Sequence, residues 1–266
     1  MNILEKIIEH KREEVARRRQ KIKISDLSDM ESFERDPLSL RDALQSQKVF
    51  GIIAEIKRSS PSAGILRTNS KPVDIAQDYT ENGAAAISVL TDEPFFSGTL
   101  DDLCYVRQVA QIPLLRKDFI IHEYQAFEAK AYGADALLLI AGILERTQLR
   151  DLHAAASELG LECLVELYEE KEVDKIAFDE MKLVGINNRD LRTFEVDLNR
   201  SITMAQHLPD DITLVSESGI SSPNDLQRLK QVGIKAALIG EHFMKAEQPG
   251  KELKKLLESL TNETTS

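Results

Sequence analysis

The chain has 266 residues, of which 42% are hydrophobic and 30% are charged. This length is enough for one large hydrophobic core and is near the size at which chains begin to split into domains. With 34 basic and 45 acidic residues the net charge is −11, which argues against a nucleic-acid partner because such proteins need a basic face. An anionic substrate would have to be held by a local cluster of basic side chains.

Nothing in the sequence indicates an exported, membrane-bound or metal-binding protein. Cys104 and Cys163 lack metal-like spacing and are typical of small residues in or near the core of a reduced protein. Residues 1–19 mix Glu and Lys with apolar residues, unlike a secretory signal. No apolar run reaches the roughly 18 residues of a transmembrane helix, and the histidines show no ligand spacing. We expect a cytoplasmic protein without a metal site.

Short apolar segments alternate with longer charged segments along most of the chain. The apolar segments are rich in β-branched residues and Leu, which predicts buried strands. The predicted strands are Gly51–Ile56, Ala86–Leu90, Ile112–Arg116, Ala136–Ile140, Cys163–Leu167, Leu183–Ile186, Ile212–Val215 and Ala236–Ile239. The predicted helices between them are Val73–Asn82, Leu100–Ala110, Glu123–Tyr132, Arg146–Leu159, Glu169–Ala177, Arg200–His207 and Pro223–Gln231.

This alternation predicts an α/β protein with a (β/α)8 TIM barrel and extra N-terminal helices. Apolar strands separated by helices suit a parallel sheet covered on its outer face. Eight such units favour a closed barrel over a doubly wound sheet. We expect residues 1–266 to form a single domain, with residues 1–45 as a helical extension that covers the barrel and residues 261–266 as a frayed tail.

In such a barrel, chemistry is expected at the carboxyl ends of the strands. Side chains alternate along the first strand, so Glu55 and Lys57 share one face whereas Ile52, Ala54 and Ile56 share the other. The apolar set suits the outer helices, which places Glu55 and Lys57 in the barrel mouth. Burying this pair is costly unless the charges are paired and used; a purely structural ion pair is the alternative.

Polar residues also end four later strands of the predicted barrel. They are Lys117, Glu166, Asn187 followed by Arg189, and Glu217. Each residue alone has an ordinary explanation, such as a solvated loop charge or a salt bridge at the rim. Their recurrence at the same end of successive strands predicts one site.

Glycine turns follow the last two strands, at Ser218-Gly219 and Gly240-Glu241. Glycine lets backbone N–H groups approach an anion closely, and barrels commonly hold phosphate in the loops after the seventh and eighth strands. Two ordinary tight turns are the alternative interpretation. The place of these turns in the eightfold order favours a phosphate site.

Ordered motifs span nearly the whole chain: Ile53–Ser62, Val89–Asp92 followed by Phe95-Phe96, Leu115–Ile120, Leu164–Glu166, Gly185–Leu191, Ser216–Ile220 and Leu238–Glu241. Together they resemble the indole-3-glycerol phosphate synthase family of tryptophan biosynthesis. The first and third motifs are highly specific, whereas other phosphate-binding barrels share the two glycine turns. We find no broken motif.

The resemblance implies a substrate, 1-(2-carboxyphenylamino)-1-deoxyribulose 5-phosphate, and a ring closure with loss of carbon dioxide and water, without metal or organic cofactor. The aromatic carbon must attack the substrate ketone, so an acid must protonate the carbonyl oxygen as charge develops on it. The partner is then a small phosphorylated molecule, with neither nucleic acid nor membrane involved. We expect a monomer, with at most weak association with other tryptophan-pathway enzymes.

The resemblance also implies residue roles. Lys117 matches the acid, and Lys57 matches the residue that grips the substrate carboxylate and helps a later proton transfer. The proton-transferring carboxylates are Glu166 and Glu55, and the orienting residues are Asn187 and Glu217. The substrate- and phosphate-binding positions are Ser60, Arg189, Leu191, Ser218, Gly219, Gly240 and Glu241, the last through its backbone N–H. Phe96 and Phe119 flank the anthranilate ring.

Three other functions remain open at this stage. A lyase or aldolase could form a Schiff base on Lys117 or Lys57, which borohydride trapping would reveal. An isomerase or synthase could act on another phosphorylated sugar, although the first motif argues against it. A non-catalytic phosphate-ligand binder would bind tightly without turnover.

Overall fold

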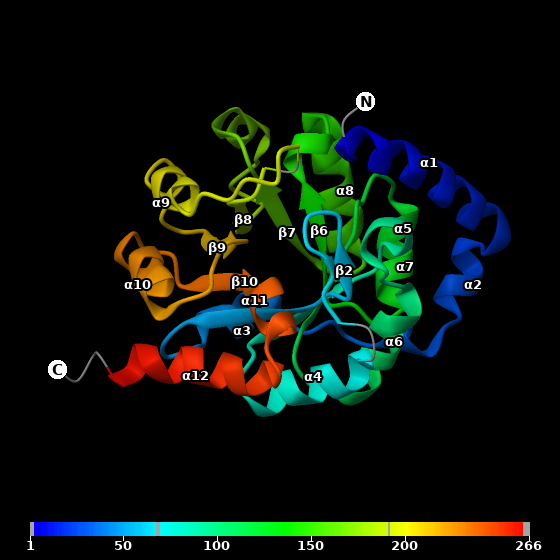
Figure 1. The fold of residues 1–266 in the computed structure, drawn as a ribbon. Coiled ribbons are helices and arrows are strands. Elements are labelled where there is room, and N and C mark those ends of the chain that lie inside the picture. The colour runs from blue at the N-terminus through cyan, green and yellow to red at the C-terminus, as the bar shows by residue number, and fades with distance from the viewer. Residues whose placement is uncertain (1–2, 68–69, 191, 263–266) are drawn as a thin grey trace.

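The computed structural model describes residues 3–67, 70–190 and 192–262. Within these residues, eight parallel strands close into a barrel in the order β1-β10-β9-β8-β7-β6-β5-β4 (Figure 1). The strands are β1 (Gly51–Ile56), β4 (Ala86–Leu90), β5 (Leu114–Lys117), β6 (Ala136–Ile140), β7 (Glu162–Leu167), β8 (Leu183–Asn187), β9 (Thr213–Glu217) and β10 (Ala236–Ile239). The predicted (β/α)8 TIM barrel is confirmed.

Four of the predicted strands have the observed bounds, and the others differ by one or two residues at one end or at both. β5 and β9 differ most: β9 ends at Glu217 instead of Val215, and β5 begins at Leu114 instead of Ile112. The prediction included Pro113, which has no N–H to donate to a neighbouring strand. In the structure its carbonyl only accepts a hydrogen bond from the Ile87 N–H, at 3.0 Å.

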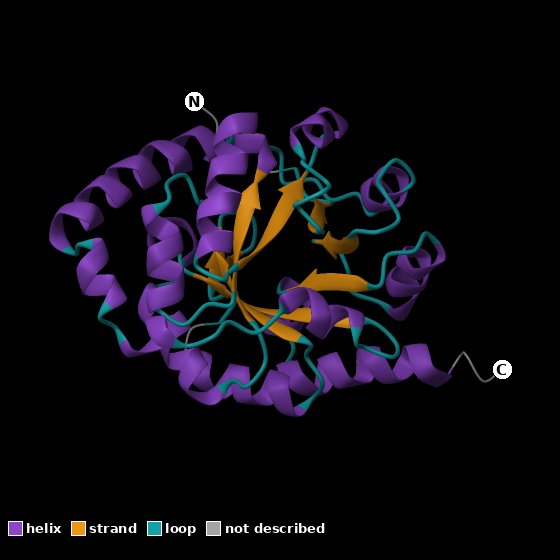
Figure 2. Cartoon of the chain, turned by 180° about the vertical axis from the view of Figure 1, so that it is seen from behind, coloured by secondary structure: helices purple, strands orange, loops and turns teal. Residues whose placement is uncertain are grey.

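Helices surround the strands in both views (Figures 1 and 2). The longer ones are α4 (Pro72–Glu81), α6 (Leu100–Val109), α7 (Tyr124–Ala131), α8 (Arg146–Glu158), α9 (Asn199–Ala205), α10 (Pro223–Gln231) and α12 (Pro249–Asn262). The shorter elements are α5 (Glu93–Phe96), α11 (Glu241–Lys245), the 3-10 helix η2 (Ala141–Ile143) and the hairpin strands β2 (Ser59–Ser60) and β3 (Gly64–Ile65).

The α-helix predicted over Glu169–Ala177 is wrong, because this segment forms only the 3-10 helix η3 (Glu170–Lys175). The carboxylate of Glu172 turns back and accepts hydrogen bonds from the backbone N–H groups of Tyr168, at 2.7 Å, and Glu169, at 3.2 Å. These bonds hold the segment in a tight turn. The three-residue spacing of Glu169 and Glu172 therefore forms a capping box at the start of η3.

Four helices precede the barrel: α1 (Ile3–Lys21), α2 (Ile24–Ser28), the 3-10 helix η1 (Glu31–Glu34) and α3 (Leu40–Gln45). Leu40 and Leu44 of α3 belong to the buried cluster inside the barrel, together with Ile53. In Figure 1, α1 and α2 run along the outside of the helix ring beside α7. Ile7 of α1 joins the same interior cluster as Phe119, which follows β5. The segment before β1 therefore packs against both ends of the barrel.

Side chains on the two faces of β1 belong to two different apolar clusters, as their alternation predicted. Ile52, Ala54 and Ile56 belong to the cluster between strands and helices, whereas Ile53 belongs to the cluster inside the barrel. All four side chains are buried, and full burial of an isoleucine is worth roughly 1.5–3 kcal/mol. This packing holds β1 so that Glu55 faces inward.

The C-terminal helix extends further than predicted. Thr261 and Asn262 continue α12, so the tail predicted to fray from residue 261 starts within a helix, and residues 263–266 lie outside the described residues. Across the described residues, none of the helices has the length and apolar character needed to span a membrane.

Candidate active site

A cavity of about 530 Å³ opens at the carboxyl ends of the barrel strands. Every candidate residue lines it except Leu191, which lies outside the described residues. The structure therefore brings together side chains from seven of the strand ends and their loops. The candidates that line the cavity are Glu55, Lys57, Ser60, Phe96, Lys117, Phe119, Glu166, Asn187, Arg189, Glu217, Ser218, Gly219, Gly240 and Glu241.

Lys117, at the end of β5, lies between two carboxylates from other strands. Its Nζ is 3.0 Å from Oε2 of Glu166 on β7 and 2.5 Å from Oε2 of Glu217 on β9. Asn187 Nδ2 donates to the other oxygen of Glu166, at 3.1 Å. Burial alone would lower the pKa of Lys117, but the carboxylates of Glu166, Glu217 and Glu55 outweigh it and raise that pKa above its ordinary value. Lys117 is therefore an ammonium ion that can donate a proton.

Burial disfavours the charged form of Glu217. Burial raises its pKa to about 8; the attraction of Lys117 opposes this shift, and repulsion from Glu166 and Glu55 adds to it. Its Oε1 has no hydrogen-bond partner among the described residues. A side chain at Gly185, in the middle of β8, would collide with that oxygen, so the glycine provides the space in which Glu217 reaches Lys117. The prediction gave Gly185 no role.

Glu217→Gln should reduce the pH dependence of stability between pH 4.5 and 8. Because the pKa of Glu217 is about 8 in the folded state and 4.5 as its ordinary value, the folded state binds the extra proton in this window. Wild-type stability therefore falls as pH rises through it, by about 2–4 kcal/mol from this group, and glutamine removes that loss. Urea unfolding of both proteins at pH 5 and pH 8 measures the difference. Equal pH slopes would contradict the assignment.

Lys57 and Glu55 form the second ion pair of the cavity, with Nζ 2.7 Å from Oε1. The lysine side chain is 16% exposed and the glutamate 4%, so Lys57 is the partner that a ligand can reach. A Cβ at Gly240 would collide with Glu55. The turn after β10 is therefore a glycine because Glu55 occupies the space beside it.

The turn after β9 has an unusual backbone. Ser218 and Gly219 are both left-handed, with φ of 69° and 76°. The buried Asn188 holds this turn, since its Nδ2 donates to the carbonyl oxygens of Glu217 and Ser218, each at 3.0 Å. A side chain at Gly219 would collide with Val196. Asn188 was part of a motif but was given no role, and only its place after β8 could have indicated one.

Cations surround Glu241 on the other side of the cavity. Arg189 Nη2 lies 2.9 Å from Oε2 of Glu241, and Lys245 Nζ lies 2.6 Å from Oε1. The hydrogen bond from Lys245, together with the charge of Arg189, lowers the pKa of Glu241. Lys245 and His242 also line the cavity, and the prediction missed both. The four-residue spacing of Glu241 and Lys245 on a helix is the signal that could have found the lysine.

Two aromatic rings form one wall of the cavity. Phe96 ends α5 and Phe119 follows β5, and their ring centroids are 6.1 Å apart with planes tilted by 39°. Such a pair offers an apolar surface against which an aromatic ligand can pack.

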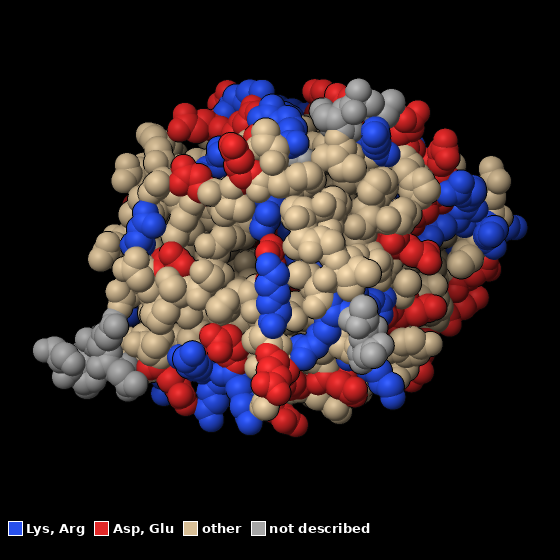
Figure 3. All heavy atoms as spheres, in the orientation of Figure 1, with Lys and Arg blue, Asp and Glu red and all other residues tan. Residues whose placement is uncertain are grey.

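Basic and acidic side chains are mixed both on the surface and in the lining of the cavity. Figure 3 shows basic and acidic side chains interspersed over one face of the molecule, and the whole chain carries −11. Lys57, Lys117, Arg189 and Lys245 all line the cavity, and each is paired with a glutamate that also lines it. Within the described ranges, no group of three or more His, Cys, Asp or Glu side chains is arranged to hold a metal ion.

Comparison with known proteins identifies the family. A profile of the indole-3-glycerol phosphate synthase family matches residues 4–256. The indole-3-glycerol phosphate synthase of Salinibacter ruber is 50% identical over 258 residues, which cover 96% of this chain and 95% of that protein. This chain belongs to the indole-3-glycerol phosphate synthase family. It is a carboxy-lyase of tryptophan biosynthesis that forms indole-3-glycerol phosphate, and the resemblance of its motifs is confirmed.

More distant solved structures share only the fold with this synthase. Thiamine phosphate pyrophosphorylase from Pyrococcus furiosus has a TM-score of 0.59 and 15% identity, over 86% of this chain and 100% of that one. KGPDC from Streptococcus mutans has a TM-score of 0.60 and 13% identity, over 81% of this chain and 99% of that one. The barrel is common to all three, whereas the activity of each depends on its own site.

Proposed function

We propose that the cavity closes the indole ring of 1-(2-carboxyphenylamino)-1-deoxyribulose 5-phosphate by acid–base chemistry of lysine and glutamate, with Lys117 as the acid. The observation that carries the proposal is the position of Lys117 between Glu166 and Glu217. The aromatic carbon attacks the ketone carbon, and the ketone oxygen needs a proton as its negative charge develops. A charged, partly desolvated ammonium ion is suited to supply it.

The later steps require two more proton transfers. Carbon dioxide leaves when the bond between the carboxyl carbon and the attacking ring carbon breaks. The electron pair of that bond returns to the six-membered ring, which becomes aromatic again. The new hydroxyl then leaves as water after receiving a proton, which we assign to Lys57 with Glu55 behind it. Glu166, held by Asn187, takes the proton that the five-membered ring loses as it becomes aromatic.

Each part of the substrate is assigned to particular residues of the cavity. Lys57 holds the carboxylate, and Phe96 and Phe119 receive the anthranilate ring. The phosphate lies at the backbone of the two glycine turns, with further contacts from the residues Ser60, Arg189, Ser218, Gly219, Gly240 and Glu241. The substrate brings a carboxylate and a phosphate, which Lys57, Lys117 and Arg189 would bind in competition with their glutamate partners.

The raised pKa of Lys117 argues against the Schiff-base alternative. Imine formation needs a neutral amine, whereas the neighbouring glutamates outweigh burial and hold the pKa of this lysine above its ordinary value. Lys57 is likewise paired to a carboxylate, at 2.7 Å.

A direct assay tests the function. Purified protein is given the carboxyphenylamino-deoxyribulose phosphate with EDTA and no added metal, and indole fluorescence is followed. We expect turnover at the same rate with and without EDTA. After treatment with cyanoborohydride in the presence of substrate and removal of all small molecules, the protein should be active on fresh substrate and unchanged in mass, because no reducible imine forms. Inactivation with a mass increase on Lys117 or Lys57 would support the Schiff-base lyase, and well-folded protein without product would support another phosphosugar enzyme.

We further propose that the protein works as a cytoplasmic monomer that associates at most weakly with other enzymes of the pathway. The two free cysteines, one buried and one partly buried, support a reducing compartment. Light scattering on the purified protein tests the monomer.

A further inference from the structure

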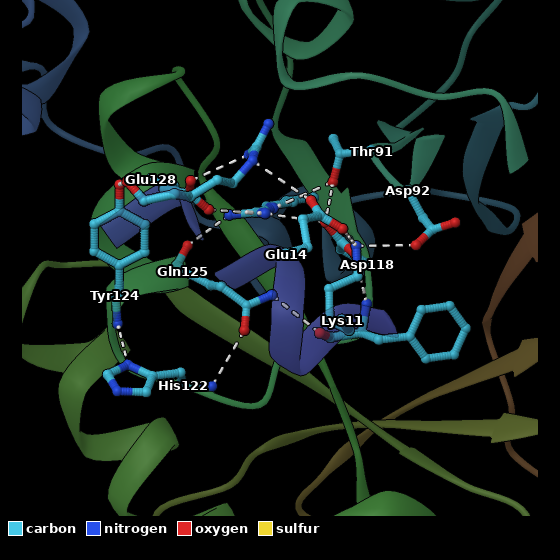
Figure 4. Close-up of polar contacts among 12 residues, drawn as sticks. Lys11, Glu14, Thr91, Asp92, Asp118, His122, Tyr124, Gln125 and Glu128 are labelled. Atoms are coloured by element: carbon cyan, nitrogen blue, oxygen red, sulfur yellow. Dashed lines mark hydrogen bonds and ion pairs between the residues drawn. The ribbon is translucent and has the colours of Figure 1, made fainter. Parts of the chain in front are cut away.

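A lysine of the N-terminal helix is buried against the rim of the barrel. Lys11 of α1 is 1% exposed, and its Nζ lies 2.9 Å from Asp92 Oδ2, 2.9 Å from Asp118 Oδ1 and 2.8 Å from Glu14 Oε2 (Figure 4). Lysine is almost never fully buried unless it is paired. Here one ammonium ion joins carboxylates that follow two neighbouring strands, β4 and β5. The mechanism described above uses none of these groups.

Each of these two carboxylates also holds a backbone group next to the aromatic wall. Asp92 is the N-cap of α5, and its Oδ1 accepts a hydrogen bond from the Phe95 N–H at 3.0 Å. Asp118 Oδ1 accepts a hydrogen bond from the Phe119 N–H at 2.8 Å. The position of Phe96, at the end of α5, therefore depends on Asp92, and the position of Phe119 depends on Asp118.

The two aspartates differ in their other support. Asp118 accepts hydrogen bonds from Thr91 Oγ1, at 2.7 Å, and from Arg116 Nη2, at 3.0 Å. Among the described residues, Lys11 is the only cation within salt-bridge distance of Asp92. Burial raises the pKa of Asp92; Lys11 opposes this shift and repulsion from Asp118 adds to it. Without Lys11, two buried carboxylates would repel each other across the gap between the two loops.

We propose that Lys11 is a positioning residue for substrate binding: by bridging Asp92 and Asp118, it sets the spacing of Phe96 and Phe119. This inference rests on the proposed role of the two rings as the surface that receives the anthranilate ring. The ring centroids lie 6.1 Å apart, and a change in the separation of the two loops alters that surface directly. Ile7, one turn before Lys11, packs into the same cluster as Phe119.

The bridge should affect KM more than kcat. Lys117 is held from the opposite side by Glu166 and Glu217, so the acid keeps its partners when Lys11 is changed. Lys11→Met retains the length of the side chain and removes the charge. We expect KM to rise about tenfold or more, because small displacements of positioning groups are costly, and kcat to stay within about threefold.

Two variants act as controls for Lys11→Met. Arg17→Met changes a cation on the same helix whose side chain is 59% exposed, and it should leave KM and kcat unchanged. Lys11→Arg keeps a cation between the carboxylates and should restore most of the loss. All values are measured well below the Tm of each variant. An unchanged KM in folded Lys11→Met would overturn the proposal.

A double variant covers the case in which Lys11→Met alone does not fold. Asp92→Asn retains the N-cap acceptor of α5 but removes one of the orphaned charges. In Lys11→Met/Asp92→Asn we expect Tm to recover toward that of the wild type while KM stays raised. Recovery of both Tm and KM would mean that Lys11 only balances charge, and the positioning role would be lost.

Two further variants separate this inference from the proposed function. Phe96→Ala and Phe119→Ala should each raise KM. If both do so and Lys11→Met does not, the inference about Lys11 fails alone. If neither does, the aromatic wall itself is not the binding surface, and the proposed binding mode fails with it.

Discussion

Lys117→Ala should reduce kcat by about 10³-fold or more while the barrel remains folded. The substitution removes the proton donor for the ketone oxygen and leaves Glu166 and Glu217, which both lie within 3.0 Å of Nζ in the wild type. The smaller side chain gives water room to solvate the two carboxylates. Steady-state kinetics by indole fluorescence, with circular dichroism to check the fold, measure the effect.

The matched control for Lys117→Ala is Lys182→Ala. Lys182 immediately precedes β8 at the opposite end of the barrel and pairs with Asp211. Each substitution removes one positive charge, so the two variants are comparable. Lys182→Ala should keep normal kcat because that end of a barrel contributes to stability. A near-normal kcat in Lys117→Ala would remove the lysine from the role of acid.

Glu166→Gln should lower kcat by about 10²–10⁴-fold with little change in KM. Glutamine keeps the shape of the side chain and an oxygen that can accept from Asn187 Nδ2, but it cannot take up the proton from the closing ring. Because binding contacts are assigned to other residues, the loss should appear in the chemical steps. Single-turnover measurements should show slow product formation after normal binding.

Glu162→Gln tests whether any neutralised carboxylate on β7 has the same effect. Glu162 begins this strand at the far end, where it accepts hydrogen bonds from Ser39 Oγ and the Arg41 N–H, each at 2.8 Å. We expect lower stability and unchanged kcat. If Glu166→Gln retained a large part of the wild-type kcat, the proton would have to go to another group, such as Glu55.

The strands and the strand-end residues could be predicted because both follow from local rules. Alternation along β1 places Glu55 inward whatever the rest of the chain does, and a closed parallel barrel brings the carboxyl ends of all its strands to one rim. Knowledge of strand order was thus enough to bring Lys117, Glu166 and Glu217 together. The exact pairing of Lys117 with both glutamates depends on side-chain geometry that no spacing rule contains.

Other features depend on contacts between distant parts of the chain. The space that Gly185 leaves for Glu217 is visible only when two strands are packed side by side. Lys11 lies four residues after Ile7 and four before Val15, so helical spacing places it on the buried face of α1, whereas Arg17 is exposed. Two of Lys11's three partners, Asp92 and Asp118, follow β4 and β5, so these partners could not be predicted without the structure.

The docking of α1 also has a consequence for the order in which the enzyme is made. Chains leave the ribosome from the N-terminus, yet α1 finds its partners far along the sequence: Arg18 bonds to Glu128, 110 positions later. The α1 segment therefore remains exposed to solvent until the first half of the barrel has been synthesised. Its many charged residues keep it soluble during that time. Lys11 can join its aspartates only then, so the wall that receives the aromatic ring is completed after the strands that support it.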